Sequence, residues 1–315
     1  MNQQKKNYIG IGVLLSLIIL CVIAANYDPY KKNSATINPN LFAVSNPAET
    51  LTKAKFKGNN VNNTLEKKQS GWRVNDSLRL DQAMFQVLTA LLERVEVQQV
   101  VSGDLKEQVK RVASDTGVVV KLYTDDRLMN SFTVAGNMKA IKTYFVQDDE
   151  VYLMQLPGYE SYVAGMFEVK TIDWQDRTVF SGTWQDIVSL TLQYPEGGTL
   201  FFKYDEGLIK LQNSKNADSV KVMNYIESFN YFYVDQFLDA DFEAVQMVDE
   251  FSTAGSIHIR ALDERKNLNL QFYEHPDFNA ILVHINGRQW AGIQQKRFEQ
   301  YFPKKISFIK GENSD

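Results

Sequence analysis

The sequence predicts an α+β protein in which an N-terminal transmembrane helix and a stalk precede two tandem repeats, each a helix-plus-antiparallel-sheet unit. Three observations predict this organisation. A charge-free apolar run occupies residues 9–25, residues 27–70 show no sustained apolar period, and apolar residues at helical spacing alternate with short strands from Trp72 onward. Short hairpin connections favour antiparallel sheets that carry helices on one face.

The apolar run predicts where the chain resides. As a helix, residues 9–25 would reach roughly 25 Å, near the low end of what spans a bilayer. Lys5 and Lys6 precede the run, and no basic residue follows it before Lys31, so the N-terminus is expected in the cytoplasm. Residues 1–26 are thus a cytoplasmic tip and signal anchor in the inner (cytoplasmic) membrane, with the bulk of the protein periplasmic or extracytoplasmic.

Two other interpretations of this segment stay open. Val22, Ile23 and Ala24 loosely fit the small-x-small pattern at which a signal peptide is cleaved. Cys21 would carry a lipid in a lipoprotein signal, although Leu20 stands where such a signal needs a small residue. A retained anchor is preferred, because the apolar run exceeds the usual signal-peptide core of roughly 7–15 residues.

Composition indicates an ordinary globular body after the anchor. The chain has 315 residues, of which 23% are charged and 44% hydrophobic, enough for one large or two small cores. Because no cysteine follows Cys21, the exported part is expected to fold without a disulfide. A net charge of −4 and the lack of a basic helix argue against a nucleic-acid partner.

Residues 27–70 are expected to form a flexible stalk, because Asn, Lys, Thr and Ala dominate them. The first repeat, residues 71–172, opens with a strand at Trp72 and an amphipathic helix over 80–95 that begins near Asp81. An extended piece at 97–102 and a polar helix at 104–114, ended by Gly117, come next. Strands are then expected at 118–123, 131–135, 143–147 and 151–155, and a short helical segment at 159–167.

A bridging segment over 173–206 is expected to hold a hairpin with strands at 188–194 and 199–204. The second repeat, residues 207–303, restates the element order of the first, and residues 304–315 form a C-terminal tail. Its elements are expected as a strand at 208–211, a helix at 220–229, an extended piece at 231–237, a polar helix at 241–251 ended by Gly255, strands at 256–261, 268–273 and 281–285, and a helical segment at 290–302. The matching order predicts a tandem repeat.

Motifs for catalysis are missing from the sequence. It contains no G-x-S-x-G elbow, no P-loop and no H-E-x-x-H pair. His258 and His284 fall in predicted strands and would share a metal only if those strands were neighbours, while His275 lies in a loop. Adjacent carboxylates sit at predicted hairpin turns, where turn geometry explains them. We therefore expect no enzyme activity, no metal and no cofactor.

Aromatic residues of the bridging segment form the candidate binding patch. Trp174, Trp184 and Tyr194 are expected to wall a cleft between the repeats, since aromatic rings stack on sugars and peptides. The denser group of aromatic residues at 225–237 is expected to belong to the core. The patch thus predicts a ligand or partner site.

The order of elements resembles the DUF4340 family. The motifs that carry the resemblance are G-W-R-V-N at residues 71–75, L-D-Q-A-M-F-Q-V-L-T-A-L-L-E-R-V at 80–95, V-Q-Q-V-V-S at 97–102 and D-W-Q-D-R-T-V-F at 173–180. The family is largely uncharacterised, and many members are single-span exported envelope proteins, some encoded beside ABC-type permeases. The resemblance implies a role accessory to a transporter or other envelope machinery, and no reaction.

The leading expectation is a membrane-anchored extracytoplasmic protein with a non-catalytic binding or scaffolding role. Its N-terminal helix would hold it in the membrane, and a protein of the cell envelope would be its partner. The alternative is an extracytoplasmic receptor for a small molecule or glycan, and a hydrolase is the least favoured class. The sequence identifies neither the partner nor the ligand.

Overall fold

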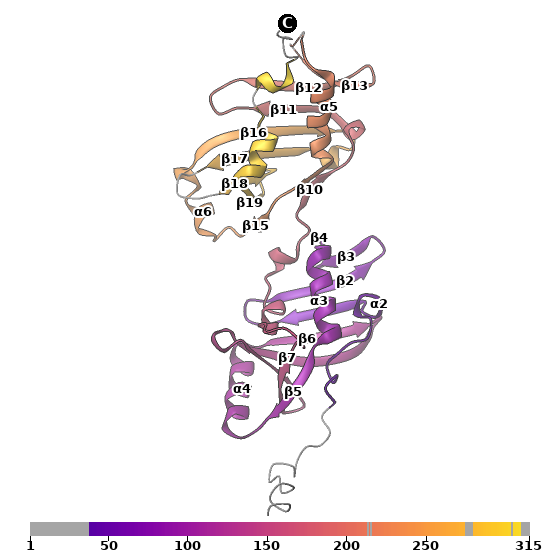
Figure 1. Cartoon of the computed structure of the whole chain (residues 1–315), viewed down its shortest axis with the longest axis vertical. Helices are drawn as coiled ribbons and strands as arrows, with labels where there is room; N and C mark the ends of the chain where they lie inside the picture. The colour runs from indigo at the N-terminus through magenta and orange to yellow at the C-terminus, as the bar shows by residue number, and fades with distance from the viewer. Residues whose placement is uncertain (1–37, 213, 215, 275–279, 304, 310–315) are drawn as a thin grey trace, which may run out of the picture.

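Residues 38–212, 214, 216–274, 280–303 and 305–309 are described by the structure, a computed structural model of the chain. They form two units arranged end to end along the long axis of the molecule (Figure 1). The first unit comprises residues 38–174 and the second residues 178–309, each with an antiparallel sheet and a separate large hydrophobic core. The mixed α/β class with antiparallel sheets therefore agrees with the sequence prediction.

The predicted membrane span at residues 9–25 lies outside the described residues. Within the part of the chain that the structure describes, no helix is long and apolar enough to cross a membrane.

Nine strands form the sheet of the first unit, in the order β4-β3-β2-β1-β6-β7-β8-β9-β5. The elements up to the first long helix are α2 (Pro47–Thr50), β1 (Lys53–Lys57), β2 (Asn62–Lys68), β3 (Gly71–Val74), β4 (Leu78–Arg79) and α3 (Gln82–Arg94). The later ones are β5 (Glu96–Val101), α4 (Gly103–Thr116), β6 (Val118–Thr124), β7 (Arg127–Asn137), the short 3-10 helix η2 (Met138–Ala140), β8 (Lys142–Gln147), β9 (Glu150–Gln155), and the 3-10 helices η3 (Val163–Met166) and η4 (Thr171–Trp174).

The two long helices of the first unit, α3 and α4, cover opposite faces of its sheet. Side chains alternate along a strand, so Phe132 and Val134 of β7 join the core beneath α3, whereas Ala135 joins a smaller cluster beneath α4. Val109 and Ala113 are the α4 residues of that cluster. Because the strand residues of this cluster come from β5, β7, β8 and β9, the other half of this sheet face, over β1, β2 and β6, carries no helix among the described residues.

Eight strands form the main sheet of the second unit, in the order β13-β12-β11-β16-β17-β18-β19-β15. The elements of its first half are β10 (Thr178–Ser181), β11 (Ile187–Gln193), β12 (Thr199–Asp205), β13 (Leu208–Leu211) and α5 (Ser219–Glu227). Those of its second half are β14 (Tyr231–Tyr233), β15 (Gln236–Leu238), α6 (Glu243–Gln246), β16 (Ser252–Ala261), β17 (Leu268–Glu274), β18 (Ala280–Ile285), β19 (Gln289–Gln294) and α7 (Gln295–Tyr301). Strands β10 and β14 pair separately as a two-stranded sheet.

The two main sheets share one connectivity. When β11, β12 and β13 are matched with β1, β2 and β3, the remaining strands follow in the same order, with β15 at the edge where β5 lies. Only the two-residue β4 has no counterpart in the second sheet. The helices also match: Asp81 caps α3 and Asp218 caps α5, each by accepting backbone N–H groups of the first turn.

Two of the predicted domain boundaries are wrong. Residues 38–70, assigned to the flexible stalk 27–70, belong to the first unit, where Phe56 of β1 and Leu65 of β2 are at most 1% exposed. The hairpin predicted in the bridging segment 173–206 is present as β11 and β12, but both are strands of the second sheet. In each case the first strand of the main sheet pairs with a strand distant in sequence, β1 with β6 and β11 with β16.

Two predicted helical segments also differ from the structure. Residues 290–302 begin as strand β19, whose Ala291 and Ile293 alternate into the core, and α7 starts only at Gln295. Residues 159–167 contain the short 3-10 helix η3 instead of an α-helix. Polar and apolar residues are intermixed in both segments, so the local pattern does not distinguish a helix from another conformation. Contacts with the rest of each unit determine the conformation instead.

Arg177 ties the two units together. Its Nε donates to Oδ2 of Asp81 at 3.2 Å, at the start of α3, and its Nη1 donates to the backbone carbonyl of Asp235 at 3.1 Å in the second unit. Beside it, Nζ of Lys170 lies 3.1 Å from Oδ2 of Asp239. Polar contacts with the first unit and with the second unit therefore hold the connecting segment in place.

Candidate functional site

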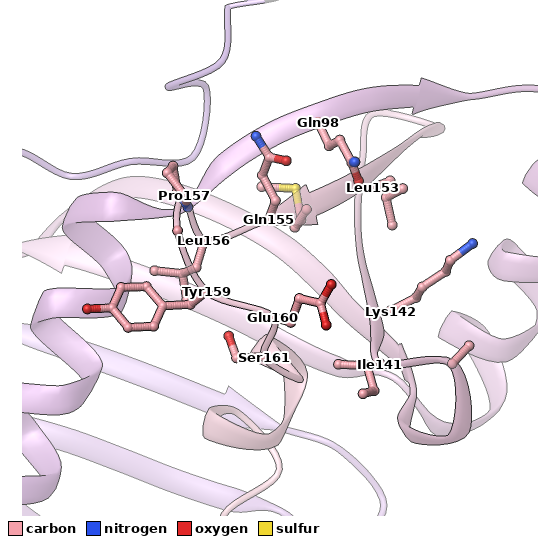
Figure 2. Close-up of a pocket in the computed structure, with 13 residues that line it drawn as sticks. Gln98, Ile141, Lys142, Leu153, Gln155, Leu156, Pro157, Tyr159, Glu160 and Ser161 are labelled. Carbon is pink, nitrogen blue, oxygen red and sulfur yellow. The ribbon is translucent and has the colours of Figure 1, made fainter.

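A groove in the first unit is the candidate binding site (Figure 2). It has a volume of about 660 Å³ and lies at one end of β8 and β9, next to the edge strand β5. This volume falls within the range of roughly 300–1,000 Å³ that ligand pockets occupy. Three stretches of the chain line it: Gln98 of β5, residues 140–142 where η2 leads into β8, and residues 153–161 at the end of β9 and in the loop after it.

The loop after β9 owes its shape to a turn at residues 156–159. The backbone N–H of Tyr159 donates to the carbonyl of Leu156 at 3.0 Å. Pro157 and Gly158 occupy the middle of the turn, and Gly158 has φ +80°, the conformation that the third position of a type II turn requires. The turn directs the chain back across the end of the sheet, and Glu160 and Ser161 follow it into the groove.

The opposite wall contains a strained backbone position. Ile141, which ends η2, has φ +51° and ψ +39°, in the left-handed region that β-branched residues rarely adopt. A residue held in this way costs on the order of 1–3 kcal/mol, and such positions cluster at functional sites. The strain therefore supports a functional role for this wall.

Most polar side chains of the groove are exposed, namely Gln98, Lys142, Glu160 and Ser161, whereas Gln155 is half-buried. Figure 2 shows the Glu160 carboxylate between the wall that carries Ile141 and the one that carries Gln155, with Lys142 across the groove. Among the described residues, no ion pair joins Lys142 to Glu160. The groove therefore offers one ammonium, one carboxylate, and the side-chain amides of Gln98 and Gln155. This lining suits recognition of a polar ligand through hydrogen bonds and charge.

The three aromatic residues predicted to share a patch do not come together. Trp174 is 0% exposed in the core of the first unit, where it stacks on Phe56 with the ring centroids 5.9 Å apart. Trp184 is half-buried on the second unit and stacks on Tyr204. The prediction of a common aromatic wall is therefore wrong for Trp174, because a completely buried ring cannot meet a ligand.

Tyr194 lies elsewhere on the second unit. Its hydroxyl donates to the backbone carbonyl of Pro303, and its ring packs against Phe302. Burial raises the pKa of Tyr194 to about 12, and the charge of Glu196 adds to this effect. Tyr194 also lines a separate cavity of about 420 Å³ with Gly197.

A cavity of about 260 Å³ does lie between the two units, but its lining differs from the predicted one. Ile172, Asp173, Arg177 and Phe237 contribute to it, whereas none of the three predicted aromatic residues does. Burial raises the pKa of Asp173, and the nearby charge of Asp239 raises it further. The cavity is smaller than most ligand pockets.

The strand histidines are also separated. His258 lies in β16 and His284 in β18, with β17 between these two strands, and His284 stacks on Trp290 at a centroid distance of 4.1 Å. Over the described part of the chain, no group of three or more His, Cys, Asp or Glu residues could hold a metal ion. His275 lies outside the described residues.

The half of the first sheet that α4 leaves uncovered carries a second candidate surface. Ala54 and Phe56 of β1 point into the core, so the alternate positions of this strand point outward and hold lysines. Lys55 stands directly opposite Lys121 of β6. We call this surface the lysine face; its members are Lys53, Lys55, Lys57, Lys68 and Lys121.

Glu66 of β2 lies among these lysines. Its Oε1 is 2.8 Å from Nζ of Lys53, and its Oε2 pairs with Lys68. Hydrogen bonds from Lys53 and Lys68 lower the pKa of Glu66 to about 2, against an ordinary value of 4.5. Glu66 thus forms ion pairs with two members of the lysine face.

Glu66 is expected to make the stability of the protein sensitive to acid. Its folded-state pKa is depressed, so the ionised carboxylate stabilises the fold above pH 4.5, and this contribution is lost as the pH falls toward about 2. Glu66→Gln should therefore flatten the rise of unfolding free energy between about pH 2 and pH 5, measured by urea unfolding at a series of pH values. Glu160→Gln, which removes an exposed carboxylate without an ion pair among the described residues, is the matched control. A wild-type slope in Glu66→Gln would contradict the assignment.

The sequence contains signals for both surfaces. The L-P-G-Y run at residues 156–159 is a type II turn sequence that follows a strand, and it predicts the loop of the groove. The K-A-K-F-K run at 53–57 alternates with a period of two, which predicts a strand with a lysine-bearing face. Bringing Gln98, Lys142 and Glu160 into one groove requires the tertiary fold.

Comparison with known proteins found no matching family model, curated protein or solved structure. The resemblance to the DUF4340 family stays a prediction that rests on the motifs quoted above.

Proposed function

We propose that this protein is a membrane-anchored extracytoplasmic binding protein of the cell envelope, with no catalytic role. Its groove in the first unit would hold a segment of a partner protein. The observation that supports this proposal is the groove itself. Lys142 and Glu160 both line it beside the edge strand β5, and neither forms an ion pair among the described residues. The resemblance noted above makes a transporter or other envelope machinery the expected source of the partner.

The form of the groove favours an extended segment over a compact ligand. It lies next to β5, the outermost strand of its sheet, where recognition of extended peptides commonly occurs. Its walls combine both signs of charge with side-chain amides, and such mixed lining resembles the polar parts of protein–protein interfaces. The strained Ile141 supports a wall held in place for binding.

The membrane anchor belongs to the same proposal. The charge-free run at residues 9–25, preceded by Lys5 and Lys6, supports a single span with a cytoplasmic N-terminus. Residues 27–37 then separate the span from Asn38, where the described residues begin. At no more than about 3.5 Å per residue, this connection reaches at most roughly 40 Å. The first unit would therefore lie close to the bilayer.

Photocrosslinking of the full-length chain in its own membranes tests the proposal. A photoreactive amino acid replaces Tyr159, which is 68% exposed at the groove, or Leu262, which is 70% exposed on the second unit and serves as the matched control. We expect position 159 to give a light-dependent adduct of one discrete mass and position 262 to give none. Glu160→Lys should remove the adduct, because it reverses the charge at the centre of the groove. Adducts at both positions, or at neither, would contradict the proposal.

A receptor for a small molecule or glycan is the second candidate, and the volume of the groove, about 660 Å³, favours it. A ligand present at 100 times its Kd would stabilise the protein by about 2.7 kcal/mol, which a thermal-shift screen resolves. A stabilising sugar whose effect disappears in Glu160→Lys would support the receptor. A flat screen together with a discrete crosslinked adduct would support the protein partner.

A further inference from the structure

The charge of the lysine face is only partly balanced. Lys53 is paired with Glu66 and Asp126, and Lys68 with Glu66 and Asp76. The other three members, Lys55, Lys57 and Lys121, are exposed, and no carboxylate within the described residues forms an ion pair with them. The chain as a whole has a net charge of −4, so this concentration of lysines does not reflect a general excess of basic residues.

The arrangement opposes the stability of the sheet. Lys55 and Lys121 are direct cross-strand neighbours on one face, and like charges in this position destabilise a β-sheet. Neither side chain contributes to the core, which lies on the other face. Nζ of Lys55 lies 5.9 Å from the ring centroid of Tyr123, but neither lysine has a carboxylate counter-ion among the described residues. Cations without counter-ions that weaken the fold are better explained by an anionic surface outside the protein.

The chemistry of the lysine face suits a lipid surface better than a protein. It spreads over the adjacent strands β2, β1 and β6, and its cations are lysines. Lysine is depleted in protein–protein interfaces, where arginine and aromatic residues dominate, because a hydrated point charge gives little geometric selectivity. A cluster of lysines near a membrane span is instead typical of recognition of anionic headgroups.

The position of the lysine face relative to the ends of the molecule adds to this argument. In Figure 1, α3 and α5 lie on the viewer's side of their sheets, and the lysine face is on the side of the first sheet opposite α3. It therefore occupies a flank of the elongated molecule. Residues 27–37 reach at most roughly 40 Å, so a span at 9–25 would keep this flank near the bilayer.

We propose that the lysine face binds the anionic phospholipid headgroups of the bilayer that holds the N-terminal span, and that it lays the molecule lengthwise along that surface. This inference rests on the membrane anchorage in the proposed function and adds to it the face that meets the membrane. The attraction acts over about one Debye length, roughly 8 Å at physiological ionic strength, so high salt should weaken it.

Lysine labelling of the full-length chain in vesicles tests the inference. The chain is reconstituted in phosphatidylcholine, or in an equal mixture of phosphatidylcholine and phosphatidylglycerol, and briefly exposed to an impermeant amine reagent. Mass spectrometry then compares Lys55, Lys57 and Lys121 with Lys221 of α5, on the other side of the molecule. We expect several-fold lower labelling of the three face lysines in the anionic vesicles only, restored by high salt, with Lys221 labelled equally throughout.

A double variant separates headgroup binding from anchorage. With Lys55→Gln and Lys121→Gln combined, Lys57 should lose its protection while the chain still floats with the vesicles. The variant should fold, because it removes a like-charge pair. Equal labelling of the face lysines in both vesicle types would overturn the inference and leave the anchorage standing. Protection in native membranes but not in anionic vesicles would also overturn it, in favour of an acidic protein. A chain that does not float would refute the anchorage and this inference together.

Discussion

Trp174→Ala is expected to destabilise the first unit by roughly 3–5 kcal/mol, the usual cost of truncating a fully buried aromatic side chain. Trp174 is 0% exposed and stacks on Phe56 of the central strand β1. Its backbone carbonyl also accepts the N–H of Asp81 at 2.9 Å, so the cavity would open beside the start of α3. Urea unfolding, followed by circular dichroism, measures the loss.

Trp174→Phe is the matched control for this substitution. Nε1 of Trp174 is buried without a hydrogen-bond partner among the described groups, so phenylalanine removes an unpaired donor while it keeps an aromatic ring. We expect a loss of about 1–2 kcal/mol, because the smaller cavity is partly offset by removal of the donor. If Trp174→Ala left the stability unchanged and abolished ligand or partner binding, the burial of this residue would be contradicted.

Gly255→Ala should cost about 2–6 kcal/mol, from backbone strain and overpacking together. Gly255 has φ +137°, a conformation that residues with a Cβ rarely adopt. An added Cβ would lie 2.4 Å from a ring carbon of Phe302 and 2.7 Å from the carbonyl oxygen of Gln193. Since the second contact is with backbone, rotation of a side chain cannot relieve it. Thermal unfolding of the full-length chain measures the effect.

Gly287→Ala separates the two causes. Gly287 also has a positive φ, +64°, but an added Cβ would meet nothing within 4 Å. This substitution should therefore cost only the conformational part, on the order of 1–2 kcal/mol. Equal losses in Gly255→Ala and Gly287→Ala would show that the close approach to Phe302 and Gln193 does not limit position 255.

Elements whose partners are close in sequence could be predicted from local patterns. In β6, alternate side chains point into the core of the first unit, namely Val118, Val120 and Leu122. The strands from β6 to β9 are joined in sequence order by hairpins. The amphipathic spacing of α3 and its Asp81 cap also identify that helix correctly. In these segments each residue type agrees with its environment, so periodicity and capping suffice.

The first strand of each main sheet could not be assigned to its sheet in this way. The alternation of β1 is compatible with a strand, but nothing in its sequence identifies β6 as its partner. The β11–β12 hairpin was recognised locally, but its membership of the second sheet depends on pairing with β16. Composition cannot report a partner that lies so far along the chain.

The candidate sites depended on the fold to an even greater degree. An aromatic residue outside a periodic segment can be buried or exposed, and Trp174 proved to be buried although its neighbours in sequence are polar. The groove combines Gln98, Lys142 and Glu160, which come from three separate segments. No spacing in the sequence links these residues, so only the topology of the sheet brings them together.

The position of the edge strands has a consequence for how the chain acquires its fold. β5 pairs with β9 and β15 pairs with β19, so each edge strand is synthesised well before the strand that receives it. Until then its backbone groups are unpaired, and unpaired strand edges promote aggregation. Because such contacts close late and over long loops, each unit is expected to fold slowly, with β9 or β19 as the last strand required. A chain interrupted before Glu150 would expose β5, and one interrupted before Gln289 would expose β15.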